Sequence, residues 1–180
     1  MAKSEPELLD VLVGVYANVN DALSDQTALR DLYQKLGASD DFDAAVISKS
    51  QDGKVKIEKT FEAGTRHDAL KGLGFGLAAG VIAAIFPSVG IAVALLAGGI
   101  GGAAIGAIVG HVQTGMRRDD LKKIGDALDS AEAALVVVYE TNLADQVKQN
   151  IKAVRQVVSK LADITAEDIE KEIRRSRAAA

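Results

Sequence analysis

The sequence predicts an α+β protein: a ferredoxin-like βαββαβ body, an inserted Gly/Ala-rich apolar helical hairpin, and a C-terminal helical extension. Runs of strand-like and helix-like apolar spacing occur on both sides of the insert. No Asp, Glu, Lys or Arg occurs from Gly72 to Met116, although 26% of the chain is charged. Apolar residues recur at helical spacing after the last strand. We therefore assign residues 1–69 and 117–142 to the body, 70–116 to the hairpin and 143–180 to the extension.

Before the insert, the expected order is strand, helix, strand, strand. Residues 11–16 are apolar and predict a buried strand, and residues 18–20 supply N-cap candidates for a helix. Gly37 is expected to end that helix. Asp52 and Gly53 lie between two alternating runs, which is a strong signal for a β-hairpin. The apolar face of the helix consists of Ala22, Leu29, Leu32, Tyr33 and Leu36.

After the insert, a helix over residues 119–128 and a strand over residues 134–139 complete the body. This order matches the split βαβ arrangement, in which the fourth strand lies at a sheet edge. Its three consecutive valines make an exposed edge prone to aggregation. We expect another subunit or the C-terminal helix to cover this strand, and packing beneath a helix is the alternative.

The extension is expected to be helical because its apolar residues step by four and three. Two heptads are too few for a coiled coil, so packing on the body is the alternative. Thr165 and Asp168 resemble a capping box for a second short helix, and the arginines at its end complement the helix dipole. The apolar seam is Val147, Ile151, Val154, Val158 and Leu161.

The insert has the dimensions and the glycine spacing of a closely packed helical hairpin. Residues 70–86 and 89–111 would form helices of roughly 25 Å and 35 Å, against about 30 Å for a bilayer core. Pro87 marks the turn. Glycines at four-residue steps make a smooth stripe that allows close backbone contact. These helix-packing glycines are Gly72, Gly76, Gly80, Gly90, Gly98, Gly102, Gly106 and Gly110.

Basic residues flank both open ends of the hairpin, and its turn has no charge. Because Lys and Arg mark the cytoplasmic side of a membrane, both ends are expected there, with the Pro87 turn outside or buried at depth. The same segment could instead form the centre of a soluble oligomer, in which identical hairpins exclude water. The flanking basic residues are Arg66, Lys71, Arg117, Arg118, Lys122 and Lys123.

Composition excludes several classes of function. The net charge is −4 and aromatic residues make up only 4% of the chain, so the sequence has no basic, aromatic-interleaved surface for nucleic acid. The absence of cysteine excludes disulfides and thiolate metal sites. The start of the chain is acidic, and no secretory signal is expected. We therefore expect partners other than nucleic acid.

Motifs for catalysis, cofactors or metals are weak. Gly74, Gly76 and Ala79 fit a dinucleotide fingerprint, but no strand directly precedes them and no acidic residue follows at the required distance. His67 and His111 flank the insert and could bind a metal or sense pH with a nearby aspartate, although a solvated histidine is more common. We assign no catalytic, cofactor-binding or metal-binding residue.

Several segments resemble the domain of unknown function 1269 family of bacterial predicted membrane proteins. The resemblance covers residues 10–141, and its most specific marks are "DGKV", the Gly-rich insert and "DDLKKIGDAL" before a valine strand. It implies a ferredoxin-like body around a glycine-zipper hairpin, a membrane link and, for some members, a stress-related label. It supplies no catalytic residue.

The sequence thus predicts a non-enzymatic, oligomeric, membrane-associated scaffold or stress-related protein. Its expected partners are further copies of itself and a lipid bilayer, with the body on the cytoplasmic side of a bacterial inner membrane. One alternative is a soluble cytoplasmic ring or shell with the hairpin as its core. A pore or a ligand-binding regulatory module is a further alternative, the latter by fold analogy alone.

Overall fold

The computed structural model describes most of the predicted body and little of the predicted hairpin. The described residues are 8–36, 42–52, 54–63, 82, 110, 113–114, 117–152, 156–165, 171, 175 and 178. All statements below concern these residues. The predicted hairpin over residues 70–116 therefore lies outside the described part, except for Ile82, Gly110, Gln113 and Thr114.

Five strands form one antiparallel sheet in the order β3-β2-β4-β1-β5, which confirms the α+β class. The strands are β1 (Leu8–Tyr16), β2 (Phe42–Lys49), β3 (Val55–Ala63), β4 (Ala133–Glu140) and β5 (Gln156–Thr165). The helices are α1 (Val19–Leu36), α4 (Arg118–Asp129) and α5 (Ala144–Asn150), with a 3-10 turn at Thr141–Leu143.

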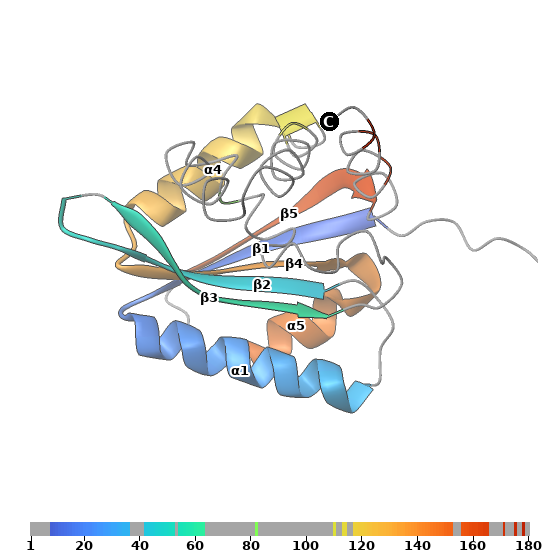
Figure 1. Cartoon of the computed structure of the whole chain (residues 1–180), viewed down its shortest axis with the longest axis horizontal. Helices are drawn as coiled ribbons and strands as arrows, with labels where there is room; N and C mark the ends of the chain where they lie inside the picture. The colour runs from blue at the N-terminus through green and yellow to red at the C-terminus, as the bar shows by residue number, and fades with distance from the viewer. Residues whose placement is uncertain are drawn as a thin grey trace, which may run out of the picture.

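Helices lie on both faces of this sheet. Figure 1 shows α1 and α5 below the sheet and α4 above it. We call these two sides the α1 face and the α4 face. The end of β1, the start of α1, the β2–β3 turn and the end of α4 all lie at the same end of the sheet (Figure 1, left). This end therefore gathers loops from distant parts of the sequence.

The α1 face holds the larger described core. Leu12, Leu29, Leu135 and Val137 are fully buried there. On α1 itself, Ala22, Leu29 and Tyr33 are buried as predicted, whereas Leu36 at the helix end is exposed. Alternation along β1 and β4 sends every second side chain to this face, where the helices remove it from water.

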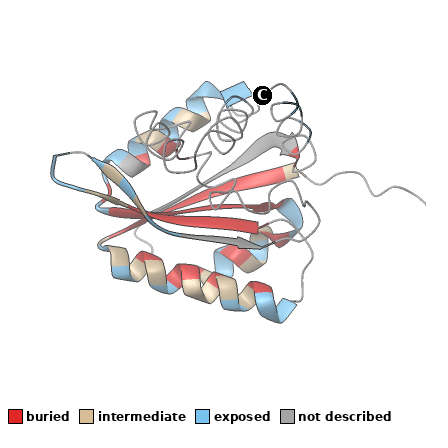
Figure 2. Ribbon diagram, viewed as in Figure 1, coloured by how far each residue is buried: buried red, intermediate tan, exposed pale blue. Residues whose placement is uncertain are grey.

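The α4 face is buried to the same degree. Val13 and Val136 pair across β1 and β4 on this side, and both are fully buried. Helix α4 contributes Ile124, which is also fully buried. Because both faces are covered, the central strands appear as continuous buried stretches in Figure 2. Ile82, from the uncharged segment, is helical and fully buried within the single chain.

The predicted position of the last body strand is wrong. β4 lies at the centre of the sheet, between β2 and β1, and not at an edge. All of its residues are buried, and hydrogen bonding to two neighbours leaves no exposed ladder. An uninterrupted run of valines fits a strand that is buried on both faces, so this run indicated a central position.

The predicted helical extension is also wrong over much of its length. α5 ends at Asn150, and the chain then forms β5, which pairs with β1. Val147 and Ile151 are buried against the body, which agrees with the alternative that the extension packs on the body and does not form a coiled coil. Val158 and Leu161 belong to β5 because β1 offers an unpaired ladder, and the β-branched residues Val157 and Val158 favour a strand. Asp168 of the predicted capping box lies outside the described residues.

The remaining predicted elements of the body are confirmed. Asn18 caps α1, because its Oδ1 accepts a hydrogen bond of 2.9 Å from the backbone N–H of Asp21. β2 and β3 pair as the predicted hairpin, with one bulge where Glu58 is the extra residue. Gln26 fixes α1 on this hairpin, since its Nε2 donates to the carbonyl oxygens of Ala44 and Lys59, each at 3.3 Å.

Candidate functional site

Most of the predicted hairpin residues lie outside the described part of the chain. Gly110 is the exception, and it is helical and exposed. A Cβ atom added there would meet nothing within 4 Å, so packing within one chain does not require glycine at this position. The residues outside the described ranges are Gly72, Gly76, Gly80, Gly90, Gly98, Gly102, Gly106, Pro87, Arg66, Lys71, His67 and His111.

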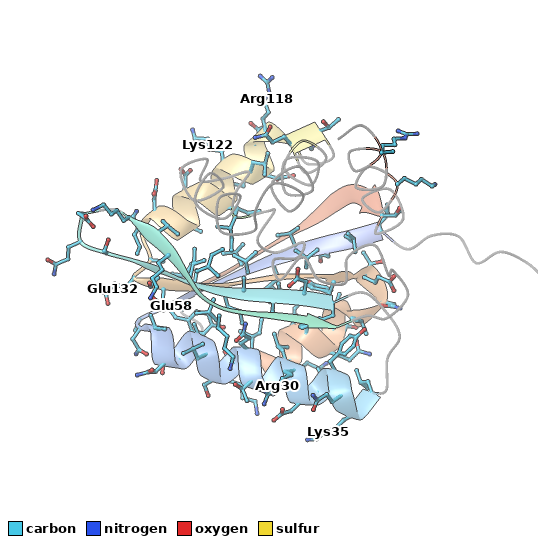
Figure 3. The ribbon with its side chains drawn as sticks, in the orientation of Figure 1. Arg30, Lys35, Glu58, Arg118, Lys122 and Glu132 are labelled. Carbon is cyan, nitrogen blue, oxygen red and sulfur yellow. The ribbon has the colours of Figure 1, made fainter. Side chains whose placement is uncertain are left out.

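The structure brings the other four predicted basic residues together at the start of α4. We call Arg117, Arg118, Lys122 and Lys123 the α4 basic cluster, and all four are exposed. Arg118 and Lys122 point away from the sheet in Figure 3. Ile124 and Ala127 of the same helix are buried. Helix α4 is therefore amphipathic, and the cluster occupies its outer side.

Arg117 is the N-cap of α4. Its carbonyl oxygen accepts hydrogen bonds from the backbone N–H groups of Asp120, at 2.9 Å, and Leu121, at 3.1 Å. Arg118 is the first helical residue. The start of a helix carries partial positive charge, which favours Asp119 and disfavours the arginines. The helix dipole therefore does not account for Arg117 and Arg118 at this end.

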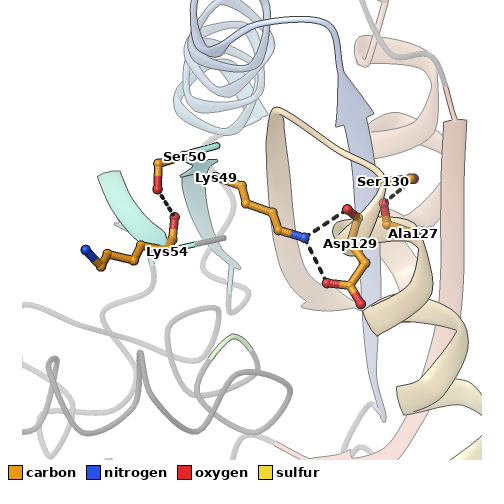
Figure 4. Close-up of polar contacts among 6 residues, drawn as sticks. All are labelled: Lys49, Ser50, Lys54, Ala127, Asp129 and Ser130. Carbon is orange, nitrogen blue, oxygen red and sulfur yellow. Dashed lines mark hydrogen bonds and ion pairs between the residues drawn. The ribbon is translucent and has the colours of Figure 1, made fainter. Parts of the chain in front are cut away.

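A polar groove of about 580 Å³ lies at the end of the sheet where the loops meet. Lys49 extends from the end of β2, and its Nζ contacts the Oδ1 and the backbone oxygen of Asp129, each at 2.9 Å (Figure 4). The backbone N–H of Lys49 donates a hydrogen bond to the backbone carbonyl oxygen of Glu132 at 2.9 Å. These contacts join β2 to the α4–β4 connection. The groove is lined by Asn18, Val19, Ser48, Lys49, Ser50, Gln51, Asp129, Ser130, Ala131 and Glu132.

The serine hydroxyls of this groove all donate to acceptors of the chain itself. Ser130 donates to the Ala127 oxygen at 2.9 Å, and Ser50 donates to the Lys54 oxygen at 3.1 Å (Figure 4). Ser48 donates to Glu58 at 2.6 Å. This bond, followed by that from Lys56, holds the pKa of Glu58 below its usual value. The hydroxyls thus fix the hairpin, and the described groove pairs none of them with a histidine base.

A buried hydrogen-bond junction joins three elements on the α1 face. The Asp25 carboxylate on α1 accepts from the hydroxyl of Tyr16 at 3.0 Å and from the backbone N–H of Lys152 at 2.9 Å. Burial is the main cause that raises the pKa of Tyr16 well above its ordinary value, and the charge of Asp25 adds to it. The junction ties α1 to β1 and to the connection between α5 and β5, so its role is structural.

The described residues offer no metal centre. No group of three or more His, Cys, Asp or Glu side chains within these ranges could hold a metal ion. A cavity of about 10 Å³ lies beside Leu29, Phe42 and Gln146, and this volume suits one water molecule. Within the same ranges, no helix combines the length and the apolar character required to cross a membrane.

Sequence reasoning missed the groove and the buried junction. Asp25 and Gln26 did give a signal, because they lie at helical spacing between Ala22 and Leu29 on the apolar face of α1. Polar residues there need buried partners. The groove had no comparable signal, since Lys49 and Asp129 meet only through the pairing of β2 with β4.

The comparisons with known proteins agree with the resemblance found in the sequence. A family model described as a protein of unknown function (DUF1269) matches residues 69–175, which is more than half of the chain. The match spans the uncharged segment, α4, β4, α5 and β5. No curated protein and no solved structure matches the chain. Since the family model matches more than half of the chain, the chain belongs to the DUF1269 family.

Proposed function

We propose that this chain is a non-enzymatic scaffold protein that associates with a membrane and assembles with copies of itself. The uncharged segment from Gly72 to Met116 mediates both contacts, and the described α+β body remains on the cytoplasmic side of a bacterial inner membrane. A stress-related role fits such a scaffold. The sequence of the segment is the main support, because it lacks charge over a length suited to a bilayer.

One structural observation carries the self-assembly part of this proposal. Gly110 lies on an exposed helical stretch, and a side chain there would meet nothing within 4 Å. An exposed helical glycine costs up to about 1 kcal/mol relative to alanine. Contact with a helix of another chain offsets this cost, because the missing side chain lets two backbones approach closely.

A soluble assembly is the second candidate, and Ile82 supports it. This residue of the uncharged segment is fully buried within the single chain. A segment that packs on protein can form the core of a soluble ring or shell, in which water is excluded by further copies of the chain.

The first experiment separates these two candidates. The full-length protein is expressed in a bacterium, the membrane pellet is washed with alkaline carbonate, and the protein is sized with and without detergent. The proposal predicts protein that stays in the washed pellet and needs detergent to be extracted. A large, uniform particle in the soluble fraction would favour the second candidate and contradict membrane association.

A charge substitution sharpens this test. Ala84→Arg places a cation in the uncharged segment, at a cost of about 2.5–3.5 kcal/mol at the centre of a membrane helix. The proposal predicts that the variant leaves the washed pellet. Thr114→Arg is the matched control, because this residue is exposed near the charged end of the segment. Aggregation of the Ala84 variant with an unchanged membrane fraction would instead support the soluble core.

Gly110→Leu tests the self-assembly. The single chain has room for the leucine, so the body is expected to remain folded while the oligomer dissociates. Val112→Leu is the control, because helical spacing in the sequence predicts that a residue two positions away faces the opposite side. An unchanged oligomer size for Gly110→Leu would remove this support for the glycine stripe.

We further propose a ferredoxin-like arrangement for the body and a glycine-zipper hairpin for the insert. The strand order supports the first part: β4 runs antiparallel between β1 and β2, and β1 runs antiparallel between β4 and β5. In this assignment α1 and α5 are the two crossover helices. β3 is then an added edge strand, and α4 belongs with the insert.

A further inference from the structure

We infer that the α4 basic cluster binds the anionic headgroups of a phospholipid bilayer, with the outer side of α4 facing the membrane. This inference rests on the proposed membrane association and adds to it a specific partner and an orientation. It is carried by the exposure of the four cations, by their concentration within residues 117–123, and by their position directly after the uncharged segment.

The cluster presents its charge to solvent from one short stretch. Arg117, Arg118, Lys122 and Lys123 are all exposed, and Arg118 and Lys122 stand one helical turn apart. Figure 3 shows both of these side chains directed away from the body. A charged group beyond this surface would therefore meet several cations at once.

The α4 basic cluster gathers four exposed cations within residues 117–123, and it differs in its lack of ion pairs from three lysines of the β2–β3 hairpin. Lys49, Lys54 and Lys56 each lie within 3.0 Å of a carboxylate oxygen, from Asp129, Asp52 and Glu58 respectively. No ion pair between described residues involves the α4 basic cluster. Within the described residues, no carboxylate is ion-paired with the cluster, so its charge can attract an external anion.

The two arginines of the cluster gain no stabilisation from the helix dipole. Arg117 and Arg118 occupy the N-cap and the first position of α4, where the helix dipole disfavours positive charge. Asp119 and Asp120 already meet the preference of this helix end for anions. An external anionic partner explains two arginines at positions where the helix dipole disfavours positive charge.

The chemistry of the surroundings favours lipid over nucleic acid. Arg117 follows directly on Met116, the last residue of the uncharged segment. Basic residues beside an apolar or amphipathic segment are the usual signature of contact with anionic lipid. The chain has a net charge of −4, which disfavours binding to the phosphates of nucleic acid. Only 4% of its residues are aromatic, so few side chains are available to stack on bases.

The acidic end of α4 sets the orientation. Asp126 and Asp129 are exposed near its C-terminal end, whereas the cations lie at its start. An anionic surface attracts the first end and repels the second. The helix is therefore tilted, with Arg118 nearest to the headgroups.

The test uses the full-length protein and vesicles of phosphatidylcholine with and without phosphatidylglycerol. The cluster variant carries Arg118→Gln, Lys122→Gln and Lys123→Gln. The control variant carries Lys35→Gln, Lys148→Gln and Lys152→Gln, which remove three exposed lysines from the α1 side of the sheet. Both variants change the net charge equally, and glutamine is a good helix former. Circular dichroism verifies that each variant folds.

We expect the wild type and the control to bind anionic vesicles more tightly than neutral ones, with a difference that shrinks as salt rises. Each basic residue near an anionic membrane contributes about fivefold in binding, so the cluster variant should lose on the order of a hundredfold on anionic vesicles at low salt. Its binding to neutral vesicles should be unchanged, because the uncharged segment is intact.

The other outcomes overturn the inference in distinguishable ways. Equal wild-type binding to both kinds of vesicle, or an equal loss in both variants, contradicts the cluster as a lipid site while membrane association stands. Absence of binding to either vesicle contradicts the proposed function, and the inference falls with it. Displacement from vesicles by inorganic phosphate identifies a site for free phosphate. Cluster-dependent binding of duplex DNA without a vesicle preference identifies a nucleic-acid surface.

Discussion

The two faces of the sheet are buried to the same degree by different means. On the α1 face, two helices supply bulky side chains, and Tyr33 packs on Phe42 with ring centroids 5.2 Å apart. The Asp25 junction adds directional hydrogen bonds. On the α4 face, the described contacts join Val15 to the small residues Ala127 and Ala131. The α1 face is therefore packed by bulky side chains and buried hydrogen bonds. The α4 face, which carries the proposed membrane-binding surface on the outer side of α4, is packed in part by small alanine side chains.

The difference in packing leads to a test of how firmly each helix is held. Leu29 on α1 and Ile124 on α4 are both fully buried. Leu29→Ala and Ile124→Ala should each lower the free energy of unfolding by about 2–5 kcal/mol, because each creates a cavity. Urea denaturation measures both variants.

The sizes of these two losses decide the comparison. Similar losses mean that α4 is as integral to the fold as α1. A loss below about 1 kcal/mol for Ile124→Ala alone would mean that α4 packs loosely and that the two faces differ in stability as well as in composition.

The buried junction provides the second-largest expected effect. Asp25→Asn removes the charge from the side chain whose Oδ2 accepts from both Tyr16 and Lys152, so two charge-assisted hydrogen bonds become weaker neutral ones. The variant should lose about 1–3 kcal/mol in the free energy of unfolding. Asp31→Asn, at an exposed surface position, is the control and should change little. An equal effect of the two substitutions would show that the junction does not stabilise the α1 face.

The same junction predicts a change in stability with pH. The pKa of Tyr16 is raised above its ordinary value of 10.0 by burial, by the charge of Asp25 and by the hydrogen bond to it. Above about pH 10, Tyr16 loses its proton in the unfolded chain but keeps it in the folded chain. The free energy of unfolding therefore falls as the pH rises. This residue should contribute a slope approaching about 1.4 kcal/mol per pH unit.

Tyr16→Phe isolates this contribution. Urea denaturation of the wild type and the variant from pH 8 to 11 should show a gap that is constant below about pH 10 and narrows above it. The other tyrosines titrate in both proteins and cancel in the difference. A gap that stays constant throughout this range would contradict a raised pKa for Tyr16.

The contact at the groove should have the smallest effect. Lys49 and Asp129 form an ion pair at the protein surface, where solvent screens the attraction. Lys49→Met should cost at most about 1 kcal/mol in unfolding free energy. Lys54→Met, which removes a more exposed lysine, should cost less. A loss of several kcal/mol for Lys49→Met would mean that this ion pair contributes as much to the free energy of unfolding as the buried residues of the α1 face.

The local elements of the body could be predicted because their signals are local. Period-two runs, the Asn18 cap and the Asp52-Gly53 turn lie within a few residues of the structure that they specify. The basic residues at the start of α4 were also identified from the sequence alone, since their position after the uncharged segment is a feature of the chain order. Their exposure and their lack of described ion pairs needed the structure.

The sequence by itself determined the α+β class, the position along the chain of each predicted strand and helix of the body, and the uncharged, glycine-rich composition of the insert. The tertiary structure decided that β4 is central and that residues 156–165 form β5. It also decided which side chains meet at Asp25 and Lys49. Strand neighbours are chosen by long-range backbone pairing and by shared burial, whose energies depend on residues far apart in the chain. A short apolar segment can therefore satisfy a helical spacing and still become a strand when a central strand offers it an unpaired edge.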